Sequence, residues 1–183
     1  MTRDEALEIL HEHVQNENLR KHAYAVEAAM RAYARKLGED EEYWGVVGLL
    51  HDFDWEIHPT LEEHPQKGGE ILRARGADEA LIADIQAHAR HTGVPRDTPV
   101  RQTLFAVDEL AGFIVACALV RPTGISDLKA KSVKKKMKDS SFAAAVSRDD
   151  IRDGAEELGV DLTEHIDFVI DAMREISGEL GLE

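Results

Sequence analysis

The adjacent residues His51 and Asp52 are the part of this sequence best suited to chemistry. They follow the apolar run VVGLL, which predicts a buried segment. A carboxylate that is buried without a partner costs much free energy, so buried charges are usually paired with another charge or bound to a metal ion. We therefore expect other parts of the chain to supply partners for this pair.

Further imidazole and carboxylate groups fall on the apolar faces of other segments. Residues three or four positions apart share one face of a helix, and by this spacing several apolar faces also carry a polar group. These groups are His22, His51 with Asp52, His64, His88 and Asp108. Taken alone, a histidine in such a place is more often a hydrogen-bonded core residue than a ligand, and an aspartate more often caps a helix or pairs with an arginine.

Taken together, these six groups favour a metal site. Burying one unsatisfied polar group costs roughly 1–3 kcal/mol, and burying an unpaired charge costs more. Six such groups without a common role would consume most of a typical stability of about 5–15 kcal/mol. A divalent cation removes the difficulty, because neutral imidazole and carboxylate are its natural ligands. Ligands of this kind suit Mn, Fe, Co, Ni, Zn or Mg, and the residues do not select among them.

The elements that must position these groups are expected to be helices throughout. Helical periodicity predominates, and no stretch shows the alternation that is typical of strands. Helices are expected over residues 3–15, 18–37, 41–52, 66–76, 78–90, 99–120, 126–138, 148–158 and 163–180. The chain is therefore predicted to form a single all-α domain over residues 1–183, with a metal-site core at about 18–120 and helices 126–180 completing it. The apolar stripe of the last helix is expected to close the core.

The order His22, His51-Asp52 and Asp108 resembles the HD-domain superfamily of metal-dependent phosphohydrolases, an all-helical fold named for its adjacent His-Asp pair. The resemblance covers roughly residues 18–120. It implies that these four residues are the ligands of a first metal ion. The stretches HARHTGVPRDTP and LFAVDELAGFIVACALVRP also resemble a subgroup of small bacterial HD hydrolases whose substrates are not known.

A second metal ion is also implied by the resemblance. Some members of the superfamily carry two further histidines between the pair and the last aspartate, which hold a second metal bridged by the aspartate of the pair. His64 and His88 stand in the matching places of this chain, and His91 lies where it could replace or assist His88. One or two metal ions per chain are therefore expected.

The function implied is hydrolysis of a small phosphate ester, such as a nucleotide, by metal-activated water. Asp52 would orient that water, and Asp54 and Glu56 are the nearest candidates for a catalytic acid, although both could equally be solvated loop residues. Lysines concentrate between residues 129 and 138, and one face of that helix could attract the substrate phosphate. That face includes Lys131, Lys134 and Lys135. The alternative for these lysines is a solvated face that balances the acidic remainder.

Two other functions remain open from the sequence. HD-type sites with two irons occur in oxygenases, and Tyr24 and Glu27 near His22 are compatible with such a site. A catalytically silent metal-binding or ligand-binding module is the third possibility. Iron content and oxygen dependence would separate an oxygenase from a hydrolase, and absence of activity on phosphate esters would favour the silent module.

Composition restricts the partners and the compartment. The net charge of −14 argues against binding to nucleic-acid polymers or anionic membranes. Cys117 is the only cysteine, which fits a reducing cytosol, and we expect it to be a small core residue. The acidic N-terminus does not resemble a signal peptide, and the run from Leu110 to Val120 is too short to span a bilayer. A soluble cytoplasmic protein that acts on a small molecule is therefore expected, with an undefined oligomeric state.

Several remaining polar side chains are expected to lie outside the site. Glu109 adjoins Asp108 but points about 100° away around the helix, toward Phe105 and Phe113. Four other histidines have charged or loop surroundings and are expected at the surface. They are His11, His13, His58 and His165.

Overall fold

The computed structural model describes residues 1–183 and contains only helices, turns and irregular segments. The helices are α1 (Arg3–His13), α2 (Glu17–Leu37), α3 (Glu41–Leu50), α4 (Gln66–Ala74), α5 (Glu79–Gln86), α6 (Pro99–Leu119), α7 (Ala130–Met137), α8 (Arg148–Leu158), α9 (Leu162–Arg174) and α10 (Ser177–Leu180), with a 3₁₀ turn at Arg90–Thr92. The predicted all-α fold is confirmed.

Helix boundaries follow the capping residues of the sequence. Asp40 accepts a hydrogen bond from the backbone N–H of Tyr43 and starts α3, and Asp78 does the same for Leu81 in α5. Gly38 ends α2 with a φ of 74°, a left-handed conformation that a residue without a Cβ adopts at little cost. Local chemistry of this kind explains why most of the expected ranges agree with the observed ones.

The largest differences from the expected ranges concern the turns and the C-terminal part. Helix α3 ends at Leu50 and α5 at Gln86, so that Asp52 and His88 lie in the turns that follow them. His64 precedes α4 and does not belong to its apolar face. The expected helix at 126–138 begins only at Ala130, whose backbone N–H donates to Asp167 of α9. The expected final helix is divided into α9 and α10 just before Ser177 and Gly178, which have low helix propensity.

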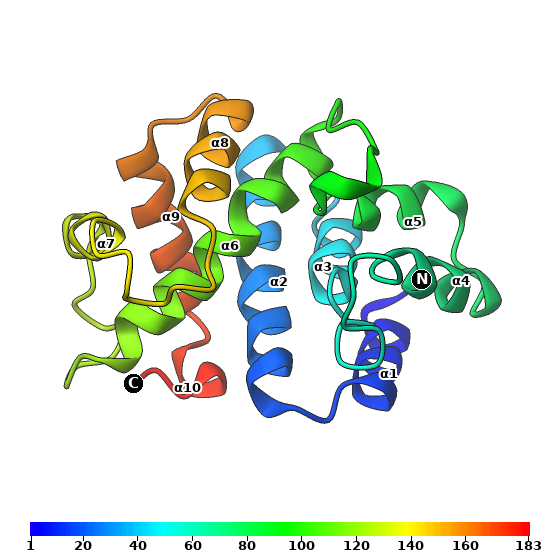
Figure 1. Ribbon diagram of the computed structural model, residues 1–183, viewed down its shortest axis with the longest axis horizontal. Helices are drawn as coiled ribbons and strands as arrows, with labels where there is room; N and C mark the ends of the chain where they lie inside the picture. The colour runs from blue at the N-terminus through cyan, green and yellow to red at the C-terminus, as the bar shows by residue number, and fades with distance from the viewer.

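Two long helices, α2 and α6, form the middle of the molecule (Figure 1). Helices α1, α3, α4 and α5 lie on one side of α2, and α7, α8 and α9 lie on the other side, next to α6 (Figure 1). The apolar residues of these elements form one continuous core. Within it, α9 buries Ile166, Val169 and Met173, so the C-terminal helices close the core as predicted.

Helix α6 is 21 residues long and, by length and composition alone, apolar enough to cross a membrane. In this fold 61% of its most apolar window is buried inside the protein. Burial of this kind is consistent with the core helix of a soluble protein.

Close helix contacts at two glycines determine how near the site-bearing helices approach. A Cβ on Gly48 of α3 would lie 2.9 Å from Met30 Cγ and 3.1 Å from Glu27 Cα, both on α2. A Cβ on Gly154 of α8 would lie 2.6 Å from Ala106 Cα on α6. Only glycine allows these contacts, because any larger residue would push the helices apart.

Candidate metal centre

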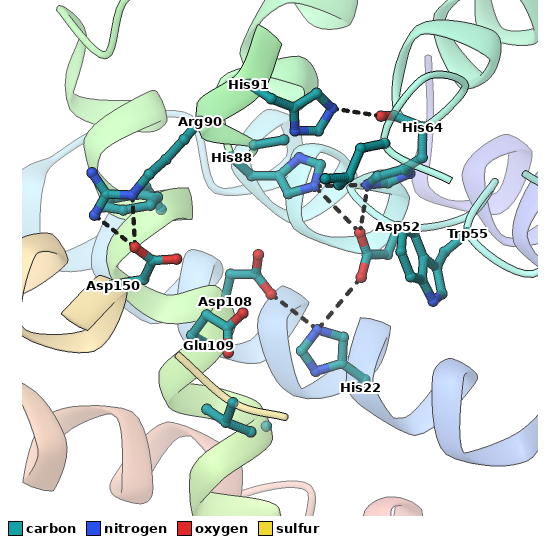
Figure 2. Close-up of a pocket in the computed structure, with 15 residues that line it drawn as sticks. His22, Asp52, Trp55, His64, His88, Arg90, His91, Asp108, Glu109 and Asp150 are labelled. Carbon is teal, nitrogen blue, oxygen red and sulfur yellow. Dashed lines mark hydrogen bonds and ion pairs between the residues drawn. The ribbon is translucent and has the colours of Figure 1, made fainter. Parts of the chain in front are cut away.

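The four residues of the adjacent pair and its distant partners converge on one point. Figure 2 shows three of them, His22, Asp52 and Asp108. His22 comes from α2, His51 and Asp52 follow α3, and Asp108 comes from α6. His22 Nε2 lies 3.2 Å from His51 Nε2 and 3.1 Å from Asp108 Oδ1, while His51 Nε2 lies 3.3 Å from the same oxygen. One potential ligand atom from each residue falls within 4.8 Å of all the others. We call these four residues the first group.

A second group shares Asp52 with the first. His64 Nε2 and His88 Nε2 lie 3.1 Å apart, and each is 3.3 Å from Asp52 Oδ1. The other oxygen of the same carboxylate, Oδ2, faces the first group at 3.5 Å from His51 Nε2. Asp52 therefore presents one oxygen to each group, which is the arrangement of a bridging carboxylate.

In three of the four histidines, the ring nitrogen that points away from the two groups is held by the protein. His51 Nδ1 donates to the carbonyl of Gly48 at 2.8 Å, and His88 Nδ1 donates to the carbonyl of Ile85 at 2.7 Å. His64 Nδ1 lies 2.8 Å from Asp54 Oδ1, which accepts its proton. Bonds of this kind leave the Nε2 lone pair of a neutral imidazole free and directed at a metal.

These donor atoms fit a divalent cation. In their neutral forms His64 and His88 direct two lone pairs at each other and at a carboxylate oxygen, an arrangement that repels unless a positive charge lies among them. Imidazole nitrogens and carboxylate oxygens are ligands of Mn, Fe, Co, Ni and Zn. The two groups together offer donors for one or two ions that share Asp52.

The electrostatics of the site also favour a cation. Burial opposes a charge on His51, yet the carboxylates of Asp52 and Asp108 outweigh it and raise the His51 pKa well above its ordinary value. Burial likewise opposes ionisation of Asp52, but His51 holds the Asp52 pKa well below its ordinary value. Burial disfavours the charged form of His64, while hydrogen bonds to Asp52 and Asp54 raise its pKa to about 9. Each shift stabilises positive charge next to the two carboxylates.

The two groups form the floor of a cleft of about 540 Å³. Trp55, Leu61, Phe105 and Val146 give it apolar walls, and Trp55 packs edge-on against the ring of His64 at 5.0 Å between ring centroids. His51 is fully buried, whereas the side chain of Asp52 is 26% exposed and is reached from the cleft. A cleft of this size accommodates a small organic molecule.

Three charged residues of the cleft wall, Arg90, Glu109 and Asp150, were not foreseen from the sequence. Arg90 lies over the ring of Phe105 at 4.8 Å and donates to Asp150 at 2.6 Å (Figure 2). It also donates to Asp153 at 2.6 Å. Glu109 was expected to face Phe105 and Phe113, but it lines the cleft and accepts the backbone N–H of Ser147. Burial raises the pKa of Glu109 to about 7. The position of Arg90 between His88 and His91 is the only signal in the sequence that could have indicated it.

The structure gives different roles to the two candidate acids. Asp54 is 1% exposed and accepts hydrogen bonds from His64 Nδ1 and from the backbone N–H of Gly68 at 2.9 Å. It therefore positions His64. Glu56 accepts hydrogen bonds from the backbone N–H groups of Gln15 and Asn16, at 2.8 and 3.0 Å. These bonds stabilise the turn between α1 and α2. The expectation that either residue delivers a proton in the cleft is corrected, because both are engaged elsewhere.

The lysine face is not brought to the cleft. Lys131, Lys134 and Lys135 belong to α7, which lies across the molecule from α4 and α5 (Figure 1). Lys134 Nζ donates to Thr163 of α9 at 2.9 Å, and Lys135 lines a separate cavity. The expected contact of this helix with a substrate phosphate at the metal centre is therefore corrected, since α7 packs against α9 and α6 instead.

The remaining polar candidates have structural roles. His91 lines the cleft, but its Nε2 donates to the carbonyl of His64 at 2.8 Å, so it steadies that turn and joins neither group. His165 was expected at the surface, but it is 1% exposed and bonds to Tyr33 and to the carbonyl of Ala106. Its apolar helix α9 carries it into the core.

Tyr24 and Glu27, the two residues considered compatible with an oxygenase site, form their hydrogen bonds away from the cleft. Tyr24 bonds to His11 at 2.7 Å, and the buried Glu27 is held by Arg3 and Arg31. Neither residue lines the cleft. Cys117 is buried in the core, as predicted.

The chain matches the sequence model of the HD domain over residues 19–112, which is more than half of its length. It belongs to the HD-domain family. The matched range begins just before His22, contains both groups and ends just after Asp108. This family consists in general of metal-dependent phosphohydrolases, which agrees with a metal-dependent hydrolase-like function for the clustered His and Asp residues. No curated protein matches the chain, and no solved structure does.

Proposed function

We propose that this HD-domain protein hydrolyses a small phosphate ester, such as a nucleotide, and that it uses one or two divalent metal ions to do so. The observation that carries the proposal is the position of Asp52, which faces both groups of ligand atoms at the floor of an open cleft. The buried free thiol of Cys117 and the burial of α6 support a soluble protein of the cytoplasm.

Divalent cations in a site of this kind lower the pKa of water and neutralise charge on phosphoryl oxygens. The residues of the chain contribute orientation and shielding. His51 and His88 are fixed by backbone carbonyls, and Asp54 holds His64, so the ligand atoms are already in place. The apolar walls formed by Trp55, Leu61 and Phe105 offer a surface for the organic part of the substrate.

The charge of the cleft makes a cation necessary for binding a phosphate ester as well as for its reaction. Asp52, Asp108, Glu109 and Asp150 all line the cleft, and Arg90 is its one arginine or lysine. Arg90 is itself paired with Asp150 and Asp153. A phosphate group would therefore be repelled from this cleft without additional positive charge. We extend the proposal to partners: the substrate is a small molecule, and neither a nucleic-acid polymer nor a membrane is bound.

The test combines metal analysis with an activity survey. The purified protein is analysed for metal equivalents per chain and then assayed for phosphate release from monoesters, diesters and nucleotides with each divalent metal. We expect one or two equivalents and turnover of at least one phosphate ester. Asp108→Ala should lower both metal content and turnover, the latter by more than about 100-fold. Asp149→Ala is the matched control, because Asp149 is 90% exposed outside the cleft and should change neither quantity.

Other outcomes would contradict the proposal in different ways. Iron in both positions with oxygen-dependent turnover would identify an oxygenase. Bound metal without turnover of any phosphate ester would favour a silent binding module. A chain that binds no metal after exposure to manganese or zinc would refute the metal centre itself.

A further inference from the structure

A second cavity, of about 560 Å³, lies away from the metal centre. Its wall includes Cys117 near the end of α6, Val120, Arg121 and Leu128 in the segment that follows that helix, and Lys135 and Lys136 on α7. Cys117 stands nine residues beyond Asp108, which corresponds to about 14 Å along the helix axis. No residue lines both cavities, so this one is a separate feature of the fold.

The charge of this cavity differs from that of the rest of the molecule. Arg121, Lys135 and Lys136 carry three positive charges on its wall, and Asp139 is its one acidic residue. The Asp139 carboxylate already accepts the N–H and the hydroxyl of Ser141. A chain with a net charge of −14 thus keeps a basic hollow at this place.

The cations of the cavity have hydrogen-bonding capacity that the protein does not use. Arg121 donates from Nη2 to Asp127 at 2.7 Å, but its Nε is buried and has no partner. Lys135 and Lys136 form no ion pair with a carboxylate, and Lys136 Nζ lies 4.5 Å above the ring of Phe142. An unsatisfied buried N–H and two unpaired ammonium groups would all gain from an anionic ligand.

We propose that this cavity is a binding site for a small organic phosphate. The phosphate would contact Lys135, Lys136 and Arg121, while Ser132 offers a hydroxyl donor on the same wall. The organic part would lie against Val120, Pro122 and Leu128, which supply apolar surface. The volume is in the range of sites that enclose a nucleotide-sized molecule. The site is independent of the function proposed for the metal centre.

The experiment is a calorimetric titration with the α,β-methylene analogue of ADP, which resists hydrolysis. Lys135→Glu reverses a charge on the cavity wall at an exposed position and should weaken binding by at least about tenfold. Lys131→Glu makes the same change on the same helix outside the cavity and should alter binding by less than about threefold. Adenosine, which lacks the phosphates, should bind at least about tenfold more weakly than the analogue.

Three results would overturn the proposal. The first is that the wild-type protein does not bind the analogue. Equal weakening by Lys131→Glu and Lys135→Glu would mean that only the general charge of α7 attracts the ligand. Loss of binding in Arg90→Gln without an effect of Lys135→Glu would place the ligand in the cleft of the metal centre instead. This test does not depend on hydrolysis at the metal centre. Binding in the second cavity is measured with variants of α7, whereas the metal centre is tested by the metal content and turnover of Asp108→Ala.

Discussion

At the scale of single residues, the position of Asp52 explains why an apolar helix leads into a charged pair. Its two oxygens face two sets of imidazole nitrogens, and its partner His51 is fully buried beside Asp108. The burial that would make these groups costly in isolation is compensated because the pair shares one centre with three further histidines and a second aspartate. Asp54 does not face the centre itself but orients His64 by accepting a hydrogen bond from its Nδ1 atom.

The role of Asp54 leads to a prediction about metal affinity. Asp54→Asn keeps the shape of the side chain but removes the charge that strengthens His64 as a ligand. We expect the affinity of the second group for metal to fall by about 10–100-fold, while the first group keeps its ion. Metal equivalents per chain after dialysis against a weak chelator would measure this.

Glu56→Gln is the matched control for this change. Glu56 lies two residues further along the chain and bonds only to the turn between α1 and α2, so its metal content should equal that of the wild type. An unchanged second equivalent in Asp54→Asn would show that Asp54 does not position His64.

At the scale of elements, the approach of α3 to α2 determines whether His51 reaches His22. The two helices touch at Gly48, one turn before His51, where a Cβ would lie within 3.2 Å of backbone atoms of Glu27. The same glycine offers its carbonyl to His51 Nδ1. A single small residue thus sets both the spacing of the helices and the orientation of a candidate ligand.

Gly48→Ala should therefore weaken both the fold and the centre. The added methyl group meets Met30 and the backbone of α2, and overpacking of this kind costs about 1–3 kcal/mol of unfolding free energy. We also expect reduced metal content, because α3 must move away from α2. Urea denaturation and metal analysis of the same sample provide the two measurements.

Gly112→Ala provides the comparison for this prediction. A Cβ at Gly112 of α6 would meet only His22, at 3.8 Å, which is an ordinary contact. Since alanine favours helices over glycine, this variant should keep or gain up to about 1 kcal/mol. Equal stability of the two variants would contradict the role given to Gly48.

At the scale of the whole molecule, charge is distributed very unevenly. The chain carries a net charge of −14, four carboxylates line the cleft, and the lysines gather on α7 beside the second cavity. The segments that meet at the metal centre are the central helices α2 and α6 and the chain next to α3, α4 and α5, which lie on one side of α2 (Figure 1). A cation at their meeting point would therefore hold separate parts of the molecule together, as well as serve the chemistry.

Metal removal should lower the thermal stability of the protein. An ion that binds the folded state alone contributes about 2.7 kcal/mol when its concentration is about 100 times its Kd. For a chain of this length we expect the Tm to fall by roughly 5–10 °C when the ion is removed by EDTA. Differential scanning calorimetry with and without metal measures the change.

The Asp108→Ala variant is the control for metal removal. It lacks one candidate ligand of the first group, so added metal should raise its Tm much less than that of the wild type. An equal rise in both proteins would mean that the ion binds elsewhere on this acidic surface.

The all-helical fold and the presence of polar groups on its apolar faces could be predicted from local patterns in the sequence, whereas the ligand set of the two groups was implied by the resemblance to the HD-domain superfamily. Capping residues determine where a helix begins and ends, and the spacing of apolar residues determines which of its faces is buried. His22 and Asp108 are on the inner faces of α2 and α6 for that reason, and His51 follows the apolar α3. His64 and His88 were assigned to a second metal by that resemblance, and both lie 3.3 Å from Asp52, in turns and not on helix faces.

Tertiary structure alone decided the roles of residues whose surroundings come from distant segments. Helical spacing directs Glu109 toward Phe105 and Phe113, but the turn before α8 meets that face of α6 and makes it a cleft wall. Asp54 and Glu56 look equivalent in the sequence, yet one reaches His64 and the other reaches the end of α1. The lysines of α7 are placed by its packing against α9, far along the chain from the metal ligands. Periodicity shows which face of an element is buried, whereas its neighbours there depend on packing over the whole chain.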